Sequence, residues 1–396
     1  MPALLFLYMF ILLLPLGNAC SFGTANNSGS ASHAEYRTAI NNVRVFNGYR
    51  LSPATTVVIE ADTIRSIGHF SHANVHIDGN GGVLMPGLID AHAHPGNTTH
   101  LEDLSRYGVT TAMLMACFNS WMCQSWKNKP GQVDIVVGSV PAAAPGSVHG
   151  NIILAADGNG NRLVSNVSIA SQWIDDAVSL RPDFIKLIAE SPGLDQQTLN
   201  TLTERAHKYG KPVACHASAY DAYNQAVVAG VDIIQHAPLD RPISFDLAQR
   251  IASQGHVVTP TLTILRAMSD ASPKTKNYAA AEETVRRLKE ASVPIVAGTD
   301  ANLVQGIATP VPFGISLHEE LQLLVQAGLS PVEALRAATS VAAKQWGLSE
   351  RGVIAPGKRA DLVLLSGNPL EDISATKSIQ RIWFAGVEFR GTIGTF

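Results

Sequence analysis

One stretch decides the fold of this 396-residue chain: MPGLIDAHAH, at residues 85–94. It is an apolar run that ends in two histidines, His92 and His94, with one residue between them. Side chains alternate along a strand, so both imidazoles of such a pair point to the same side. Imidazole is a ligand that borderline cations such as Zn²⁺ accept. The stretch therefore predicts a buried strand with a metal-binding pair at its carboxyl end.

Four further apolar runs end in residues of the same chemistry. They are FIKL at 184–187, CH at 215–216, QH at 235–236 and GTD at 298–300. Together with the first stretch they supply four histidines, one aspartate and one lysine, which is a two-metal ligand set if the lysine is carbamylated. The predicted metal ligands are His92, His94, Lys186, His216, His236 and Asp300. We expect two divalent metal ions at this site, with Zn²⁺ as the first choice.

The spacing of these runs predicts the architecture. Lys186 lies 30 residues before His216, which lies 20 residues before His236. One strand with its helix and loops takes about 20 to 40 residues. The candidate strands are Val83–Ala91, Val109–Ala116, Asp134–Val140, Asp183–Ala189, Lys211–Ala217, Val231–Ala237, His256–Leu262 and Pro294–Thr299, with amphipathic stretches such as Gln196–Lys208, Tyr220–Ala229 and Ala279–Glu290 between them. This α/β pattern predicts a (β/α)8 TIM barrel over residues 83–349, with its active site at the carboxyl ends of the strands.

The two ends of the chain have a different pattern of apolar residues from the predicted barrel. Residues 39–82 and 350–396 contain short alternating runs, which predict short antiparallel strands outside the barrel. Residues 1–19 are apolar with small residues at the end, so we expect a secretory signal peptide and a secreted protein. An uncleaved membrane anchor is the alternative. Residues 20–38 then form a flexible lead-in.

Composition and short sequence motifs limit the kinds of partner that this protein can have. Charged residues make up 15% of the chain and the net charge is −3, which gives no electrostatic basis for nucleic-acid binding. We expect the partner to be a small-molecule substrate. Contact with a membrane is expected only through an uncleaved amino-terminal segment, and the sequence leaves open whether the protein is a homo-oligomer. Sequons at Asn26, Asn97 and Asn166 fit a secreted glycoprotein. Cys117 and Cys123 could form a disulfide after the second strand.

The chain resembles the amidohydrolase superfamily of metal-dependent hydrolases over nearly everything after residue 40. The residues that carry the resemblance are MPGLIDAHAH at 85–94, AGTD at 297–300 and GVIAPGKRADLV at 352–363. It is most similar to the branch of imidazolonepropionases, Xaa-Pro-type dipeptidases and ochratoxin-hydrolysing amidases. The resemblance implies that Lys186, on the fourth strand, is carbamylated and bridges two metals. It also implies that residues 39–82 and 350–396 together build one small discontinuous β-sandwich domain. The second strand departs from many relatives, because MACFN at 115–119 replaces a short Asp-Gly-Gly-like turn.

Asp300 and Lys186 are the predicted catalytic residues. Two cations lower the pKa of a bridging water, and Asp300 can take its proton and pass it to the leaving nitrogen. Without carbamylation, Lys186 would need an ion pair, with Asp300 or Glu190 as the alternatives. The resemblance implies that His149, in GSVHG after the third strand, touches the substrate. Tyr220 could reach a substrate carboxylate or the developing oxyanion.

The predicted function is hydrolysis of an amide-type C–N bond by a metal-activated hydroxide. The substrate would be a small molecule: a linear or cyclic amide, an N-acyl amino acid or a dipeptide. A lactonase, dehydratase or decarboxylase with the same metal site is the alternative, because a fold does not fix its chemistry. A binding protein without catalysis is a third possibility, and it conflicts with the complete ligand set.

Five other histidines and Cys215 are predicted to have no part in the metal site. His69, His72 and His76 have metal-like spacing, but they precede the first barrel strand without a carboxylate in register, so a polar turn is expected. His207 and His318 lie in helical stretches and are expected to be solvated or capping. Cys215 alternates away from His216 and is expected to be a buried thiol.

Overall fold

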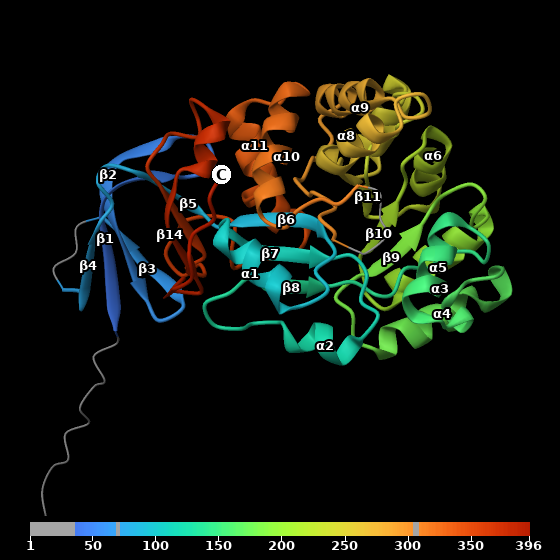
Figure 1. The fold of residues 1–396 in the computed structure, drawn as a ribbon, viewed down its shortest axis with the longest axis horizontal. Coiled ribbons are helices and arrows are strands. Elements are labelled where there is room, and N and C mark those ends of the chain that lie inside the picture. Colours follow the sequence, from blue (N-terminus) through green and yellow to red (C-terminus); the bar gives the residue numbers. More distant parts are fainter. Residues whose placement is uncertain (1–35, 69–71, 304–308) are drawn as a thin grey trace, which may run out of the picture. The chain divides into compact units, whose positions relative to one another are not determined.

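A closed ring of parallel strands carries the site (Figure 1). The computed structural model describes residues 36–68, 72–303 and 309–396. Its barrel strands form two hydrogen-bonded groups, β6-β7-β8 and β9-β10-β11-β12. Their bounds are β6 Leu88–Ala93, β7 Val109–Leu114, β8 Asp134–Val137, β9 Ile185–Ile188, β10 Val213–His216, β11 Ile233–Gln235 and β12 Val257–Thr259. All are short and almost wholly buried, as expected of a parallel sheet covered by helices.

Isolated bridges join the two groups into a barrel. On one side, Gly138 pairs with Phe184, and Ala142 pairs with Leu187. On the other side, the extended segment at residues 294–301 bridges β12 and β6, because Ile295 pairs with Val258 and Ala301 pairs with Ala93. This segment is the predicted eighth strand, although it is not a regular one. The predicted TIM barrel is confirmed.

The first predicted strand, Val83–Ala91, is divided in the structure. Its first part is β5 (Val83–Pro86), which pairs with β1 and β13 in a different sheet, while β6 pairs with β7 in the barrel. Gly87 separates the two parts, and a Cβ on Gly87 would lie 2.2 Å from the Thr110 side chain. A glycine is therefore required where the chain leaves the outer sheet and enters the barrel.

The outer sheet is built from both ends of the chain. Its order is β15-β14-β13-β5-β1-β2-β3, with β4 paired to β1. The bounds are β1 Arg37–Phe46, β2 Leu51–Glu60, β3 Thr63–Ile67, β4 Val75–Asp78, β13 Leu362–Leu365, β14 Ile379–Phe384 and β15 Val387–Glu388. Strand β5 lies in the middle of this order, so the amino-terminal and carboxyl-terminal strands share one set of hydrogen bonds. This is the expected β-sandwich region.

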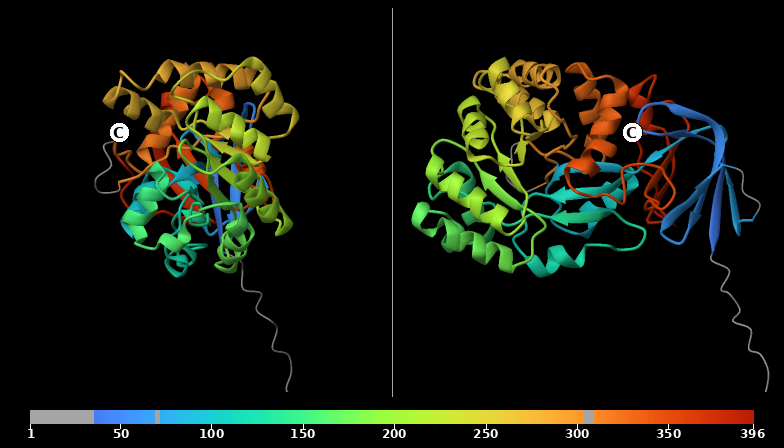
Figure 2. Two further views of the ribbon diagram at one scale, coloured as in Figure 1. Left: turned by 90° about the vertical axis from the view of Figure 1, so that its right-hand side faces the viewer. Right: turned by 180° about the vertical axis from the view of Figure 1, so that it is seen from behind.

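The helices lie around the outside of the barrel strands, as the rear view of Figure 2 shows. Their bounds are α1 Thr98–Arg106, α2 Ser120–Ser125, α3 Val148–Asp157, α4 Val167–Ser179, α5 Gln196–Lys208, α6 Tyr220–Ala229, α7 Phe245–Ser253, α8 Leu262–Ala271, α9 Tyr278–Glu290, α10 Ile315–Gln326, α11 Pro331–Ala337 and α12 Ser340–Gln345, with 3-10 turns η1 Gly160–Arg162 and η2 Ile373–Lys377. Helices α5 and α6 have the bounds that the sequence predicted. The side chain of Asp195 caps α5 by accepting from the Thr198 amide, which is why the helix begins there.

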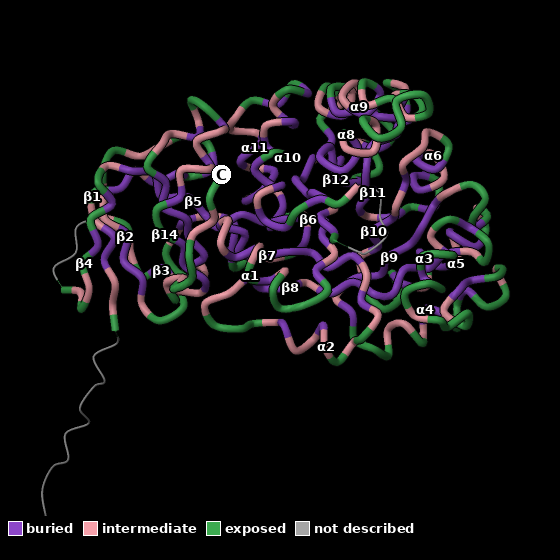
Figure 3. Tube along the Cα trace, in the orientation of Figure 1, coloured by how far each residue is buried: buried purple, intermediate pink, exposed green. Residues whose placement is uncertain are grey.

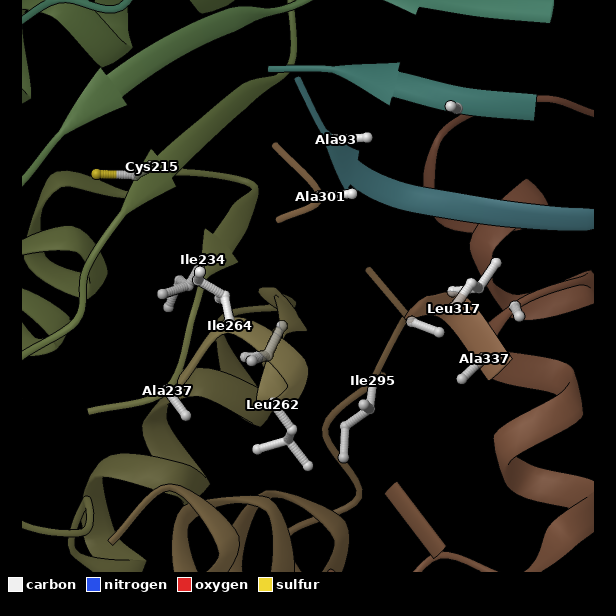
Figure 4. Packing of buried hydrophobic residues seen from close by; sticks show 14 of the residues in the cluster. Ala93, Cys215, Ile234, Ala237, Leu262, Ile264, Ile295, Ala301, Leu317 and Ala337 are labelled. Carbon is white, nitrogen blue, oxygen red and sulfur yellow. The ribbon is translucent and has the colours of Figure 1, made fainter. Parts of the chain in front are cut away.

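Burial follows the barrel pattern (Figure 3): the strands are mostly buried, and exposed positions gather on the outer helices. Figure 4 shows part of the large apolar cluster between strands and helices, in which Cys215 lies with Ile234 and Leu262. Cys215 is fully buried and free, as predicted, and burial raises the pKa of its thiol to about 12. It is therefore an unreactive packing residue.

Several predictions fall at the amino terminus. The signal peptide, the lead-in up to residue 35 and Asn26 lie outside the described residues, as does His69. Among the helices of the described part, none is both long enough and apolar enough to cross a membrane.

Candidate metal centre

Three of the predicted metal ligands lie together where the barrel closes. His92 lies in β6 and His94 directly follows this strand, while Asp300 lies in the adjacent extended segment at residues 294–301. Oδ1 of Asp300 lies 3.0 Å from Nε2 of His94 and 3.4 Å from Nε2 of His92. Their ligand atoms all lie within 4.8 Å of one another, a spacing that could hold one metal ion. Strand alternation and barrel closure together produce this cluster.

The other two predicted histidines extend the cluster across the barrel mouth. The ring of His236 lies 4.8 Å from that of His92, and the ring of His216 lies 4.4 Å from that of His236, centroid to centroid. Burial lowers the pKa of His92, His216 and His236 well below 6.5, and the neighbouring Lys186 and histidines lower it further. These imidazoles are therefore neutral at physiological pH, the form that binds metals.

Lys186 lies at this cluster without a hydrogen-bond partner. It is 3% exposed, and its Nζ has no hydrogen-bond partner among the described residues. Burial lowers the pKa of this lysine to about 8, against the attraction of Asp300. The alternative partner Glu190 is instead bonded to His149. A buried amine without a partner is costly, so a structural ion pair does not explain this residue.

Asp300 is held as an ionised carboxylate. Burial alone would raise its pKa, but the hydrogen bond from His94 and the nearby Lys186 cation hold the pKa below its ordinary value. Its backbone has a φ of 56°, an uncommon conformation for a residue with a side chain. Asp90 fixes that turn by accepting from the amide (3.0 Å) and hydroxyl (2.7 Å) of Thr299.

Two residues that orient histidine ligands were missed from the sequence. Oε1 of Gln235 lies 2.7 Å from Nδ1 of His92, and the hydroxyl of Thr261 lies 2.8 Å from Nδ1 of His236. A partner on Nδ1 fixes the tautomer and leaves Nε2 free for a metal. Gln235 and His236 are adjacent, and alternation would send them to opposite sides. The positive φ of His236, 74°, breaks the alternation and lets both reach His92.

The two predicted substrate residues lie in different surroundings. His149 is in the first turn of α3, with its ring 4.2 Å from that of His216, and its Nδ1 lies 2.8 Å from Oε2 of Glu190. In the described part of the chain, no contact joins Tyr220 to the predicted metal-binding histidines. Its ring lies under Arg241, 4.1 Å from the guanidinium carbon, and its hydroxyl lies 3.5 Å from that of Ser244.

The remaining predictions can now be compared with the structure. Cys117 and Cys123 form a disulfide, a pairing that the sequence left open. The prediction for His318 was wrong: it is fully buried, where Nδ1 contacts Thr376 and Nε2 contacts the Tyr107 carbonyl. Periodicity could not show this, because both partners come from distant elements. His207 is partly exposed beside Asp232.

Comparison with known proteins agrees with this geometry. Residues 83–388 match the model of the Amidohydrolase family. The enamidase of Eubacterium barkeri is 24% identical over 364 residues, which cover 85% of this chain and 89% of that enzyme. An imidazolonepropionase of Pyrobaculum arsenaticum is 28% identical over 188 residues, covering 46% of this chain and 42% of that protein. A crystal structure of a Xaa-Pro dipeptidase with bound methionine shares the fold at a TM-score of 0.78 and 21% identity, over 90% of this chain and 100% of that one.

A TIM barrel with clustered imidazoles and a carboxylate at the strand ends defines the class of barrel-type metal-dependent hydrolases. Within that class, the chain belongs to the amidohydrolase family. The predicted resemblance is confirmed.

Proposed function

We propose that this protein hydrolyses an amide-type C–N bond in a small molecule, with two divalent cations, zinc being the expected metal. The observation that carries the proposal is the buried Lys186 amine, which lies among neutral histidines without a hydrogen-bond partner in the described part. Carbamylation would turn this cation into an anion with two oxygens and so remove the cost of burying it. The names of the enamidase and the Xaa-Pro dipeptidase support the bond type.

The residues fit a pair of cations by their chemistry. Neutral imidazoles and a carboxylate are the donors that zinc accepts, and they line one end of the barrel. The residues that would hold the two ions are His92, His94, Lys186, His216, His236 and Asp300. When bound, divalent cations lower the pKa of a water molecule and polarise a carbonyl group.

Asp300 provides the proton transfer in this proposal. Its carboxylate is ionised because its pKa is held below the ordinary value, so it can accept a proton at an oxygen. Its side chain is 18% exposed, which leaves room for contact with a substrate. Returning the proton to the leaving nitrogen would complete hydrolysis, because an amine leaves more readily than its anion.

His149 and Glu190 would orient the substrate. Glu190 accepts from both the ring and the backbone amide of His149, which fixes the imidazole beside His216. Burial would raise the pKa of Glu190, but the hydrogen bond from His149 keeps it below its ordinary value. A fixed imidazole at the rim can donate to a polar group of the bound molecule. Tyr220 would contribute only if Arg241 moved from its ring.

Elemental analysis and a hydrolysis screen test the proposal. Protein grown with added zinc should carry close to two metals per chain, and His92→Ala should lose metal while His76→Ala, at an exposed histidine outside the site, should not. The screen uses linear and cyclic amides, N-acyl amino acids, dipeptides and lactones. Turnover of lactones alone would favour the alternative lactonase reaction, and one metal or none would refute the two-metal site.

We also propose that the protein is secreted. The disulfide between Cys117 and Cys123 supports this, because such bonds persist in oxidising compartments. Asn97 and Asn166 are exposed, and each caps a helix through its side-chain Oδ1, whereas a glycan would be attached to Nδ2. Sequencing the mature amino terminus tests the proposal, and an intact Met1 in soluble intracellular protein would refute it.

A further inference from the structure

A buried carboxylate lies behind the metal centre on helix α10. Glu320 is 0% exposed, and its two oxygens accept three hydrogen bonds from the beginning of α8. The donors are the Leu262 amide at 2.9 Å, the Thr263 amide at 2.7 Å and the Thr263 hydroxyl at 2.8 Å. Burial raises the pKa of Glu320 to about 8, even though these bonds act against that rise. The carboxyl group is therefore costly to ionise here, and its role is to supply acceptor oxygens to the amides at the beginning of α8.

The amino end of α8 has no cap of its own. Its N-cap residue is Thr261, the residue type that normally caps a helix with its hydroxyl, yet Thr261 makes no such bond. Its backbone has a φ of 52°, a left-handed conformation that is strained for a β-branched residue. The first amides of α8 are buried and would be unsatisfied without Glu320. The acceptor therefore comes from a helix 58 residues away along the sequence.

The hydroxyl of Thr261 contacts a histidine instead of capping α8. Oγ1 of Thr261 lies 2.8 Å from Nδ1 of His236, and both residues are fully or almost fully buried. Because this hydroxyl occupies Nδ1 of His236, Nε2 is the ring nitrogen left for a metal. A cap bond from Thr261 to α8 and an unstrained backbone would both turn the hydroxyl away from the imidazole.

We propose that Glu320 is a positioning residue for His236: by capping α8 it holds Thr261 in the left-handed conformation that keeps its hydroxyl on the imidazole. The inference rests on the proposed metal role of His236. Substitution of Glu320 or of Thr261 should therefore affect metal binding in the same way, by removing the Thr261 hydroxyl from the His236 imidazole. Neither residue contacts a substrate or a reacting atom.

Zinc affinity measured by competition with a chromogenic chelator tests this. Thr261→Val removes the hydroxyl at constant shape, and Glu320→Gln replaces one acceptor oxygen by a donor. Each should weaken zinc binding about 10- to 100-fold, the usual effect of removing a group that orients a ligand. The double variant should be no weaker than the weaker single variant, since the two substitutions break the same pathway. Thr261→Ser, which keeps the hydroxyl, should restore most of the affinity.

Two controls lie on the same helix. Glu319→Gln removes a charge from an exposed neighbour, and His318→Ala breaks buried hydrogen bonds on the other side of α10. Neither should change zinc affinity, even where His318→Ala lowers the melting temperature. Wild-type affinity in Glu320→Gln, independent effects in the double variant, or a Glu320→Gln chain that does not fold would each overturn the inference. His236→Ala separates it from the proposed function: if that variant binds zinc normally, the proposed site itself fails.

Discussion

Replacing Lys186 by methionine should stabilise the metal-free protein while it abolishes metal binding. The pKa of Lys186 falls from an ordinary value of 10.5 to about 8 in the folded chain because the amine is buried. Since a pKa shift of one unit corresponds to about 1.4 kcal/mol, keeping this amine protonated destabilises the folded state by about 3 kcal/mol. The cost is present in full below pH 8, falls as the pH rises, and is absent above pH 10.5, where both states are neutral.

Metal-free Lys186→Met should therefore exceed metal-free wild type in free energy of unfolding by up to about 3 kcal/mol at pH 7. This gain is already net of the attraction of Asp300, which raises the pKa of Lys186 and so limits its fall. Urea denaturation of both chelator-treated proteins at pH 7 and pH 10 measures the difference, which should shrink at the higher pH. Lys211→Met is the matched control: its Nζ donates to the Pro182 carbonyl at 2.8 Å, so this change should stabilise nothing.

The same position tests the carbamate. Lys186→Ala should lose most metal and activity, and a short-chain carboxylate with added zinc should restore part of both, because a free carboxylate can occupy the gap and bridge two cations. Loading of the wild type should require bicarbonate. If Lys186→Met is clearly less stable than the metal-free wild type, or if Lys186→Ala keeps full metal and turnover, Lys186 is a structural residue and the reasoning is wrong.

Other residues give further predictions. Burial lowers the pKa of His318 to about 4, so the unfolded chain takes up this proton at higher pH, and this residue should contribute about 3 kcal/mol to the loss of stability between pH 6.5 and pH 4. In urea denaturation the loss should be smaller by about that amount in His318→Gln, because the other buried histidines still contribute, and an equal loss in both proteins would contradict the prediction. Cys123→Ser opens the loop closed by Cys117 and should lower the free energy of unfolding by about 2 kcal/mol, as reduction of the wild type should. Asp300→Asn should lower kcat by at least about 100-fold in steady-state assays, since it cannot accept the proton, and unchanged kcat would exclude Asp300 as the base.

The sequence by itself determined the barrel and the residue types at its mouth. Period-2 alternation placed His92 and His94 on one side of a strand, and regular spacing of apolar runs placed the other ligands at strand ends. Helices α5 and α6 were also predictable, because their apolar periodicity is local. These features depend only on neighbours along the chain.

The tertiary structure decided how those residues are held. Gln235 contacts His92 across 143 residues, and Glu320 caps α8 from another helix, so no local pattern encodes either contact. Tyr220 shows the same limit, because Arg241 and Ser244, which contact its side chain, follow a different strand. Left-handed backbone at His236 breaks the alternation on which sequence reasoning depends. Closing the barrel imposes these conformations, since only the packing of distant segments can hold a strained residue in place.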